Sequence, residues 1–192
     1  MPHSTGLRGR ELIKGHATLN DFLMLVDPGC EVAISGADIA AVCDRHSGIG
    51  ADGFIRAVQR DGNWFMDYRN ADGSKAEMCG NGVRVFVDHL RREGLVDLPL
   101  GATLDVVTRG GIKRVTPLEE DGGHGAHYRV DMGAASSPAR ETIEVRIPGV
   151  EGVLGGLWVD MPNPHTVVEL ADEETLRGVT LPTIDVSRLA PG

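Results

Sequence analysis

The chain has 192 residues, of which 41% are hydrophobic and 24% charged, and its formal net charge is -9. This length suits one large domain or two small ones with a buried core, and the composition is that of an ordinary globular protein. The acidic balance argues against nucleic acid bound through a basic surface. No apolar run approaches the ~18 residues of a membrane-spanning helix, so we expect no association with a membrane.

The chain contains three cysteines, Cys30, Cys43 and Cys79. They are too few for a disulfide framework, and their spacing does not match a zinc site. The first residues lack the apolar core of a secretory signal. We therefore expect a cytoplasmic protein with free thiols and no bound metal.

The first predicted elements are a strand over residues 21–27 and a helix within residues 35–50. Ser35 is a suitable N-cap, and Asp38 three residues later completes a capping-box pattern. Apolar residues continue at helical spacing, and Gly48 is suited to end this helix.

Two strand-like runs flank Asp61-Gly62, which predicts a β-hairpin. A second helix is predicted directly after Cys79 and can end at Gly94. Its apolar stripe has helical spacing: Val83, Phe86, Val87 and Leu90.

Strand-like segments dominate the remainder, with a turn at Gly110-Gly111 and a short helix predicted over residues 171–178. Many strands with two clear helices, and no regular alternation of strand and helix along the chain, indicate an α+β fold. Small residues and a proline cluster at residues 132–138, which suggests a domain over residues 1–133 and a second over residues 134–192.

The segment "AEMCGNGVR" (76–84) places the Cys79 thiol at a predicted helix start. Free N–H groups and the positive end of the helix dipole favour a thiolate there, and they also suit a substrate carboxylate. Gly80 and Gly82 allow close approach, and the Asn81 amide can donate and accept. Asn70 ends a predicted strand, and a turn at Asp72-Gly73 is expected to bring Cys79 back toward it, so that the amide and the thiol face one cavity.

The segment "YRNADGSKAEMCGNGVRVF" (68–86) is similar, almost residue for residue, to the first catalytic motif of the diaminopimelate epimerase family. The segments "KGHATLNDFLML" (14–25), "CDRHSGIGADG" (43–53) and "MPNPHTVV" (161–168) resemble further stretches of that family in the same order. In the second of these, Gly53 stands where some members carry a glutamine.

The resemblance implies a mixed antiparallel sheet wrapped around a central helix, with a second, similar domain that is incomplete here. It also implies a two-base epimerisation of LL- and meso-diaminopimelate in lysine and peptidoglycan synthesis, without pyridoxal phosphate or another cofactor. Cys79 falls on the first catalytic cysteine, and His165 falls on a residue that tunes the thiols. Five residues fall on substrate contacts: Asn20, Asn70, Gly80, Asn81 and Asn163. A homodimer that binds a small amino acid is the expected assembly.

The sequence departs from the family after the "NPH" segment, because no Glu-Arg or Cys-Gly pair follows His165. Cys43 lies on an apolar helix stripe and Cys30 in a turn, so neither resembles the second thiol. The chain is then a fragment, half of a complementary pair or a divergent protein. Three other functions stay open: a racemase of another amino acid, a non-catalytic amino-acid-binding or assembly module, and a cysteine hydrolase that pairs Cys79 with His165.

Overall fold

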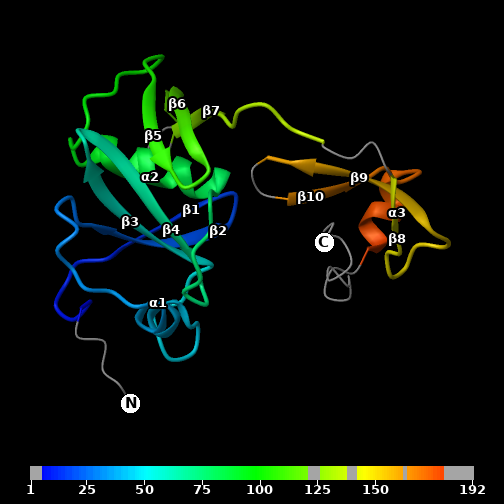
Figure 1. Cartoon of the computed structure of the whole chain (residues 1–192), viewed down its shortest axis with the longest axis horizontal. Coiled ribbons are helices and arrows are strands. Elements are labelled where there is room, and N and C mark those ends of the chain that lie inside the picture. The colour runs from blue at the N-terminus through cyan, green and yellow to red at the C-terminus, as the bar shows by residue number, and fades with distance from the viewer. Residues whose placement is uncertain (1–5, 121–125, 138–141, 162–163, 180–192) are drawn as a thin grey trace. The chain divides into compact units, whose positions relative to one another are not determined.

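The computed structural model describes residues 6–120, 126–137, 142–161 and 164–179. The chain divides into two compact units, Met1–Met132 and Gly133–Gly192 (Figure 1). The first unit contains the Cys79 segment and most of the buried apolar side chains.

The first unit is built on a seven-stranded sheet whose spatial order follows the chain order. Its β2–β3 and β4–β5 pairs are parallel, and its other neighbouring pairs are antiparallel. The strands are β1 (Ile13–Ala17), β2 (Asn20–Val26), β3 (Gly53–Arg60), β4 (Asn63–Asn70), β5 (Leu104–Thr108), β6 (Gly111–Glu120) and β7 (Ala126–Asp131).

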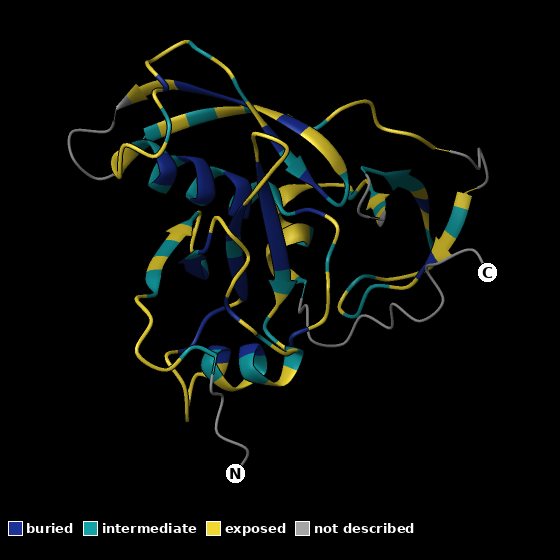
Figure 2. Ribbon diagram, turned by 60° about the vertical axis from the view of Figure 1, so that its left-hand side comes forward, coloured by how far each residue is buried: buried dark blue, intermediate teal, exposed yellow. Residues whose placement is uncertain are grey.

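The helix α2 (Gly80–Arg92) lies against one face of this sheet and contacts β1, β2, β3, β4, β6 and β7 (Figures 1 and 2). The sheet therefore curls around the helix, and the expected α+β fold with a mixed sheet around a central helix is confirmed. The predicted apolar stripe forms the buried side of the helix: Val83, Phe86, Val87 and Leu90. A helix with one such face gains most of its stability from this burial rather than from its intrinsic propensity.

The strand β2 is buried on both faces. Successive side chains of a strand point to opposite sides of the sheet, and each side of β2 is covered by a different apolar cluster. Phe22 and Met24 join the cluster around α2. Leu23 and Leu25 join a second cluster under the helix α1 (Gly36–Cys43). Full burial of one such side chain contributes about 1.5–3 kcal/mol. The strand that begins at Asn20 is thus held between two apolar layers.

The predicted start of α1 is confirmed, since Ser35 caps the helix and forms a reciprocal capping box with Asp38. The predicted end near Gly48 is wrong, because α1 stops at Cys43 and Asp44 has extended backbone angles. The carboxylate of Asp44 accepts hydrogen bonds from the N–H groups of His46 and Ser47, at 2.9 and 2.6 Å. This local turn takes the place of the expected last helical turn. Aspartate side chains that bond to nearby backbone N–H groups compete with the helix in this way.

The predicted hairpin joins β3 and β4 through Asp61 and Gly62, whose φ angles of 50° and 78° lie in the left-handed region. Two such residues match the twist of a tight hairpin, so this prediction is confirmed. The predicted end of α2 is also confirmed, because Gly94 has a φ of 65° and donates its N–H to the carbonyl of Arg91.

The second unit contains a three-stranded antiparallel sheet in the order β10-β9-β8. Its elements are β8 (Thr142–Val145), β9 (Leu154–Asp160), β10 (Pro164–Val168) and α3 (Glu173–Gly178). The helix α3 confirms the helix predicted over residues 171–178, and Asp172 caps it by accepting from the N–H of Thr175.

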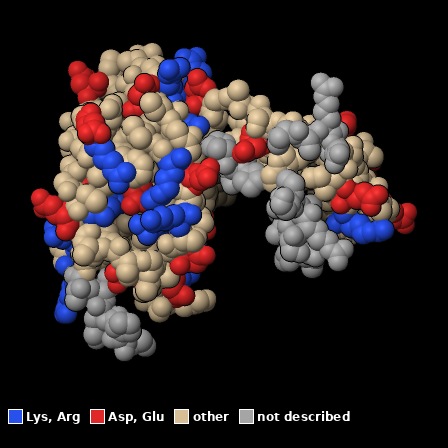
Figure 3. All heavy atoms as spheres, viewed as in Figure 1, with Lys and Arg blue, Asp and Glu red and all other residues tan. Residues whose placement is uncertain are grey.

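Among the described residues, no helix is long and apolar enough to span a membrane. Acidic and basic side chains are interspersed on the face of the molecule shown in Figure 3.

Candidate functional site

Cys79 is the N-cap of α2 and is half-buried. Its backbone is extended, with φ -140° and ψ 119°, and its Sγ accepts a hydrogen bond from the N–H of Gly82 at 3.4 Å. The first turn of a helix has N–H groups without intrahelical partners, and the dipole places partial positive charge there. The thiol therefore lies where a negatively charged group of a ligand can be bound.

A tight turn returns the chain from the end of β4 toward Cys79. The N–H of Gly73 donates to the carbonyl of Asn70 at 2.9 Å, and Gly73 has a φ of 82°. A Cβ at Gly73 would lie 2.0 Å from the carbonyl oxygen of Gly36, so this contact requires glycine. The loop is thus packed backbone to backbone against the start of α1.

Arg109 fixes the same loop from the other side. Its Nη1 donates to the carbonyl of Tyr68 at 2.8 Å and to that of Ala76 at 3.1 Å, and its Nη2 pairs with Asp67. The N–H of Gly110 also donates to the carbonyl of Glu77 at 3.1 Å. These bonds join the strand end to the residues that lead into Cys79.

Two amide side chains lie beside the thiol. The Oδ1 of Asn20 accepts from the Sγ of Cys79 at 3.7 Å and from the Nδ2 of Asn81 at 3.3 Å. The Oδ1 of Asn81 in turn accepts from Arg84 and, at 3.2 Å, from Thr18. The structure thus brings Cys79, Asn20 and Asn81 together in one hydrogen-bonded group with a guanidinium at its outer end.

Asn70 lies at the end of β4 and is exposed. Its Oδ1 accepts from the hydroxyl of Tyr68 at 3.1 Å, and its Nδ2 donates to the Oγ of Ser74 at 3.0 Å. Burial raises the pKa of Tyr68 to about 12, with smaller contributions from the charges of Cys79 and Asp52. The Tyr68 hydroxyl therefore keeps its proton at neutral pH and orients the Asn70 amide.

The two glycines of the motif differ in what surrounds them. A Cβ at Gly82 would lie 3.3 Å from the Cδ1 of Ile55 and 3.5 Å from the ring of Phe22, which is tight packing inside the unit. A Cβ at Gly80 would make only an ordinary contact with Met132, at 3.8 Å. Packing thus explains Gly82, whereas Gly80 leaves an open approach to the helix start.

Sequence reasoning misses several residues near the site. Asp52 accepts from the Nδ2 of Asn20 at 2.9 Å, and Arg45 donates to Asp52 at 2.8 Å. Both lie in the segment "CDRHSGIGADG", so its resemblance to the family is a usable signal. Arg84 lies in the segment "YRNADGSKAEMCGNGVRVF", so the same signal applies to it, whereas Arg109 carries none, because single arginines after a strand are common on protein surfaces.

The other two cysteines have different settings. Cys43 is buried, as expected for core packing, and burial raises its pKa to about 11. Cys30 is exposed in the turn after β2, with a φ of 57°.

Two expected site residues belong to the second unit. His165 is an exposed residue of β10, paired in register with Val159. Asn163 lies outside the described residues. Within the part of the chain that the structure describes, no group of three or more His, Cys, Asp or Glu side chains is arranged to hold a metal ion.

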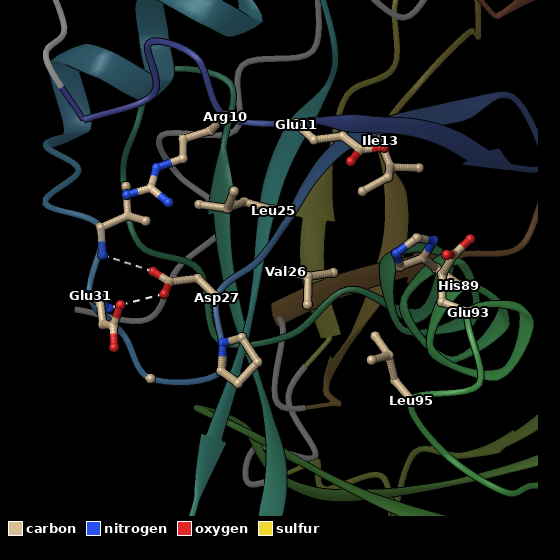
Figure 4. Close-up of a pocket in the computed structure, with 13 residues that line it drawn as sticks. Arg10, Glu11, Ile13, Leu25, Val26, Asp27, Glu31, His89, Glu93 and Leu95 are labelled. Atoms are coloured by element: carbon tan, nitrogen blue, oxygen red, sulfur yellow. Dashed lines mark hydrogen bonds between the residues drawn. The ribbon is translucent and has the colours of Figure 1, made fainter.

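One cavity of the first unit has residues of the site group in its lining, and another does not. One of about 540 Å³ is lined by Thr18 and Arg84, the residues that bond to Asn81, together with parts of β1, α2 and β7. The other, of about 590 Å³, is lined by residues that include Asp27 and His89 (Figure 4). In the second cavity, Asp27 already accepts from the N–H groups of Glu31 and Val32, so its carboxylate is engaged by its own loop (Figure 4).

The chain matches the family model described as "Diaminopimelate epimerase" over residues 12–138. It is similar to the diaminopimelate epimerase of Corynebacterium glutamicum, with 44% identity over 79% of this chain and 55% of that protein. It is also similar to the diaminopimelate epimerase of Thermobifida fusca, with 41% identity over 82% of this chain and 59% of that protein. The chain thus spans less than two thirds of the length of these relatives.

Among solved structures, the fold is similar to a hydroxyproline epimerase from Agrobacterium vitis with bound trans-4-hydroxy-L-proline. The TM-score is 0.59 at 10% identity, over 86% of this chain and 52% of that one. At this identity the similarity concerns the fold.

Proposed function

Because the chain belongs to the diaminopimelate epimerase family, we propose that Cys79 transfers a proton at the α-carbon of diaminopimelate. The observation that carries this proposal is the position of its sulfur at the start of α2, where the N–H of Gly82 donates to it at 3.4 Å. A thiolate is the reactive form of cysteine, and a helix start favours it. The reaction class is an epimerisation that needs no pyridoxal phosphate.

In the proposed step, the Cys79 thiolate removes the α-proton. The C–H bond breaks, an S–H bond forms, and the electron pair of the C–H bond delocalises into the substrate carboxylate. The free N–H groups of the first turn of α2 bind that carboxylate and stabilise the added charge. Gly80 leaves room for this approach, and the Asn20, Asn70 and Asn81 amides supply further hydrogen bonds to the amino acid.

Inversion of the α-carbon needs a proton donor on the opposite face. Cys43 is buried in the cluster under α1, away from any substrate, and Cys30 lies in an exposed turn, so neither is suited to that task. We propose that this chain supplies one half of the two-thiol pair, and that Asn163 and His165 are further contacts of the site. A second thiol from outside these 192 residues would complete the exchange between the LL and meso forms.

The wider setting is also a proposal. The reaction would serve lysine and peptidoglycan synthesis in the cytoplasm, with a small amino acid as the bound partner and a homodimer as the assembly. The free thiols of Cys30, Cys43 and Cys79 support a reducing compartment.

The test is exchange of the substrate α-proton in D₂O, followed by mass spectrometry and by chiral separation of the product. We expect deuterium uptake with the original chain, and at least a ~100-fold loss in Cys79→Ala, since the base is removed. Cys30→Ser is the matched control and should keep the original rate. Undiminished exchange in Cys79→Ala would show that this thiol is not the base.

The stereochemical outcome separates the remaining possibilities. Uptake with retention indicates one working thiol, and uptake with inversion indicates a second donor. Binding of diaminopimelate without uptake would instead support a non-catalytic amino-acid-binding module. Uptake that is faster with another amino acid would support a racemase of that substrate.

A further inference from the structure

The carboxylate of Asp52 lies directly before β3 and contacts the amide of Asn20. Its Oδ2 accepts from the Nδ2 of Asn20 at 2.9 Å and from the N–H of Asp21 at 3.1 Å. We infer that Asp52 is a positioning residue that holds the Asn20 amide with its oxygen toward Cys79. This inference rests on the proposed function of Cys79.

The orientation follows from the donors and acceptors available. An asparagine amide has one end that only donates and one that only accepts, and a carboxylate only accepts. The Nδ2 of Asn20 must therefore face Asp52, which leaves its Oδ1 facing the Sγ of Cys79 at 3.7 Å and the Nδ2 of Asn81 at 3.3 Å. The reversed amide would place two oxygens together at Asp52 and two N–H groups together at Asn81.

Asp52 is itself held in place by two neighbours. Its Oδ1 accepts from Arg45 at 2.8 Å, and its N–H donates to the Oδ1 of Asp21 at 3.0 Å. Arg45 also binds both carboxylate oxygens of Asp21, at 2.6 and 3.1 Å. Such a two-pronged arginine contact restricts geometry as well as adding attraction.

The exposure of these groups indicates a geometric role rather than a large contribution to stability. The Arg45 and Asp52 side chains are 53% and 43% exposed, and ion pairs this exposed contribute little to folding. Removal of the Asp52 charge should therefore alter the surroundings of Cys79 more than the stability of the unit.

The experiment measures iodoacetamide labelling of Cys79 at neutral pH, resolved by peptide, in Asp52→Asn, Asn20→Ala and the double variant. An amide at position 52 can donate to the Asn20 oxygen, so the Asn20 N–H group can turn toward the sulfur and favour the thiolate. We expect Asp52→Asn to label about 2–10-fold faster, the range of one hydrogen bond. The same substitution should have no further effect in the Asn20→Ala background.

Asp105→Asn is the matched control, since Asp105 is an exposed carboxylate of β5 paired with Arg114. It should leave Cys79 labelling unchanged, and urea unfolding should show that all variants fold. Asp52→Ser also removes the carboxylate that holds the Asn20 amide, with a smaller side chain, and gives a second measurement of Cys79 labelling. Unchanged labelling in both Asp52 variants, or an effect that persists in Asn20→Ala, would overturn the inference. If the original chain showed no α-proton exchange, that result would count against the proposed function alone, because the labelling of Cys79 needs no substrate.

Discussion

Burial of Cys43 gives a quantitative prediction about which thiol is available for chemistry. Its pKa rises from 9.0 to about 11, and each pH unit is a tenfold change in thiolate. At neutral pH the reactive fraction of Cys43 therefore falls by about 100-fold on folding. Its side chain is only 2% exposed, so restricted access adds to this protection.

The assay compares iodoacetamide labelling of native and urea-unfolded protein, with each cysteine followed in its own peptide. We expect Cys43 to label at least ~100-fold more slowly in the folded chain than in the unfolded one. Exposed Cys30 should show little protection, and Cys79 should label before Cys43. Native labelling of Cys43 within about tenfold of its unfolded rate would refute the reasoning from burial.

Three further predictions concern the scaffold. In urea denaturation, Gly73→Ala should lower the free energy of unfolding by more than ~2 kcal/mol, because Gly73 has a left-handed φ and lies against Gly36. Gly62 has a similar φ but open space around it, so Gly62→Ala should lower the free energy of unfolding by only about 1 kcal/mol. Phe86→Ala should cost about 3–5 kcal/mol in the same assay, because its ring is fully buried. The pKa of Asp21 is lowered chiefly by Arg45, so its stabilisation is present above the unfolded pKa of about 3.9 and is lost as pH falls through the folded value. Unfolding free energy should therefore decline below about pH 4, and less steeply in Asp21→Asn.

The sequence predicts the local elements well because their signals are local. Asp61-Gly62 specifies its hairpin through left-handed angles, and the apolar stripe from Val83 to Leu90 specifies the buried face of α2. The end of α1 is not predicted from the spacing of apolar residues, because it is set by the hydrogen bonds from the N–H groups of His46 and Ser47 to the Asp44 side chain.

The site is harder to predict because its contacts are far apart in the chain. Asn20 and Cys79 are joined only once β2 and the start of α2 lie side by side, and the parallel β2–β3 pairing places Asp52 beside Asn20. Here the family motifs supply residues that periodicity does not, whereas the hydrogen bonds that join these residues to one another come only from the structure.

Arg109 has a consequence for the tolerance of this protein to insertions and deletions. The loop over residues 71–79 is tied at Ala76 by Arg109 and at Glu77 by Gly110, and Gly73 lies against Gly36. Surface loops usually accept changes in length. In this loop, one added or lost residue would break these hydrogen bonds or displace the Cys79 thiol from the start of α2. The length of the loop should therefore tolerate as little change as the residues of the site.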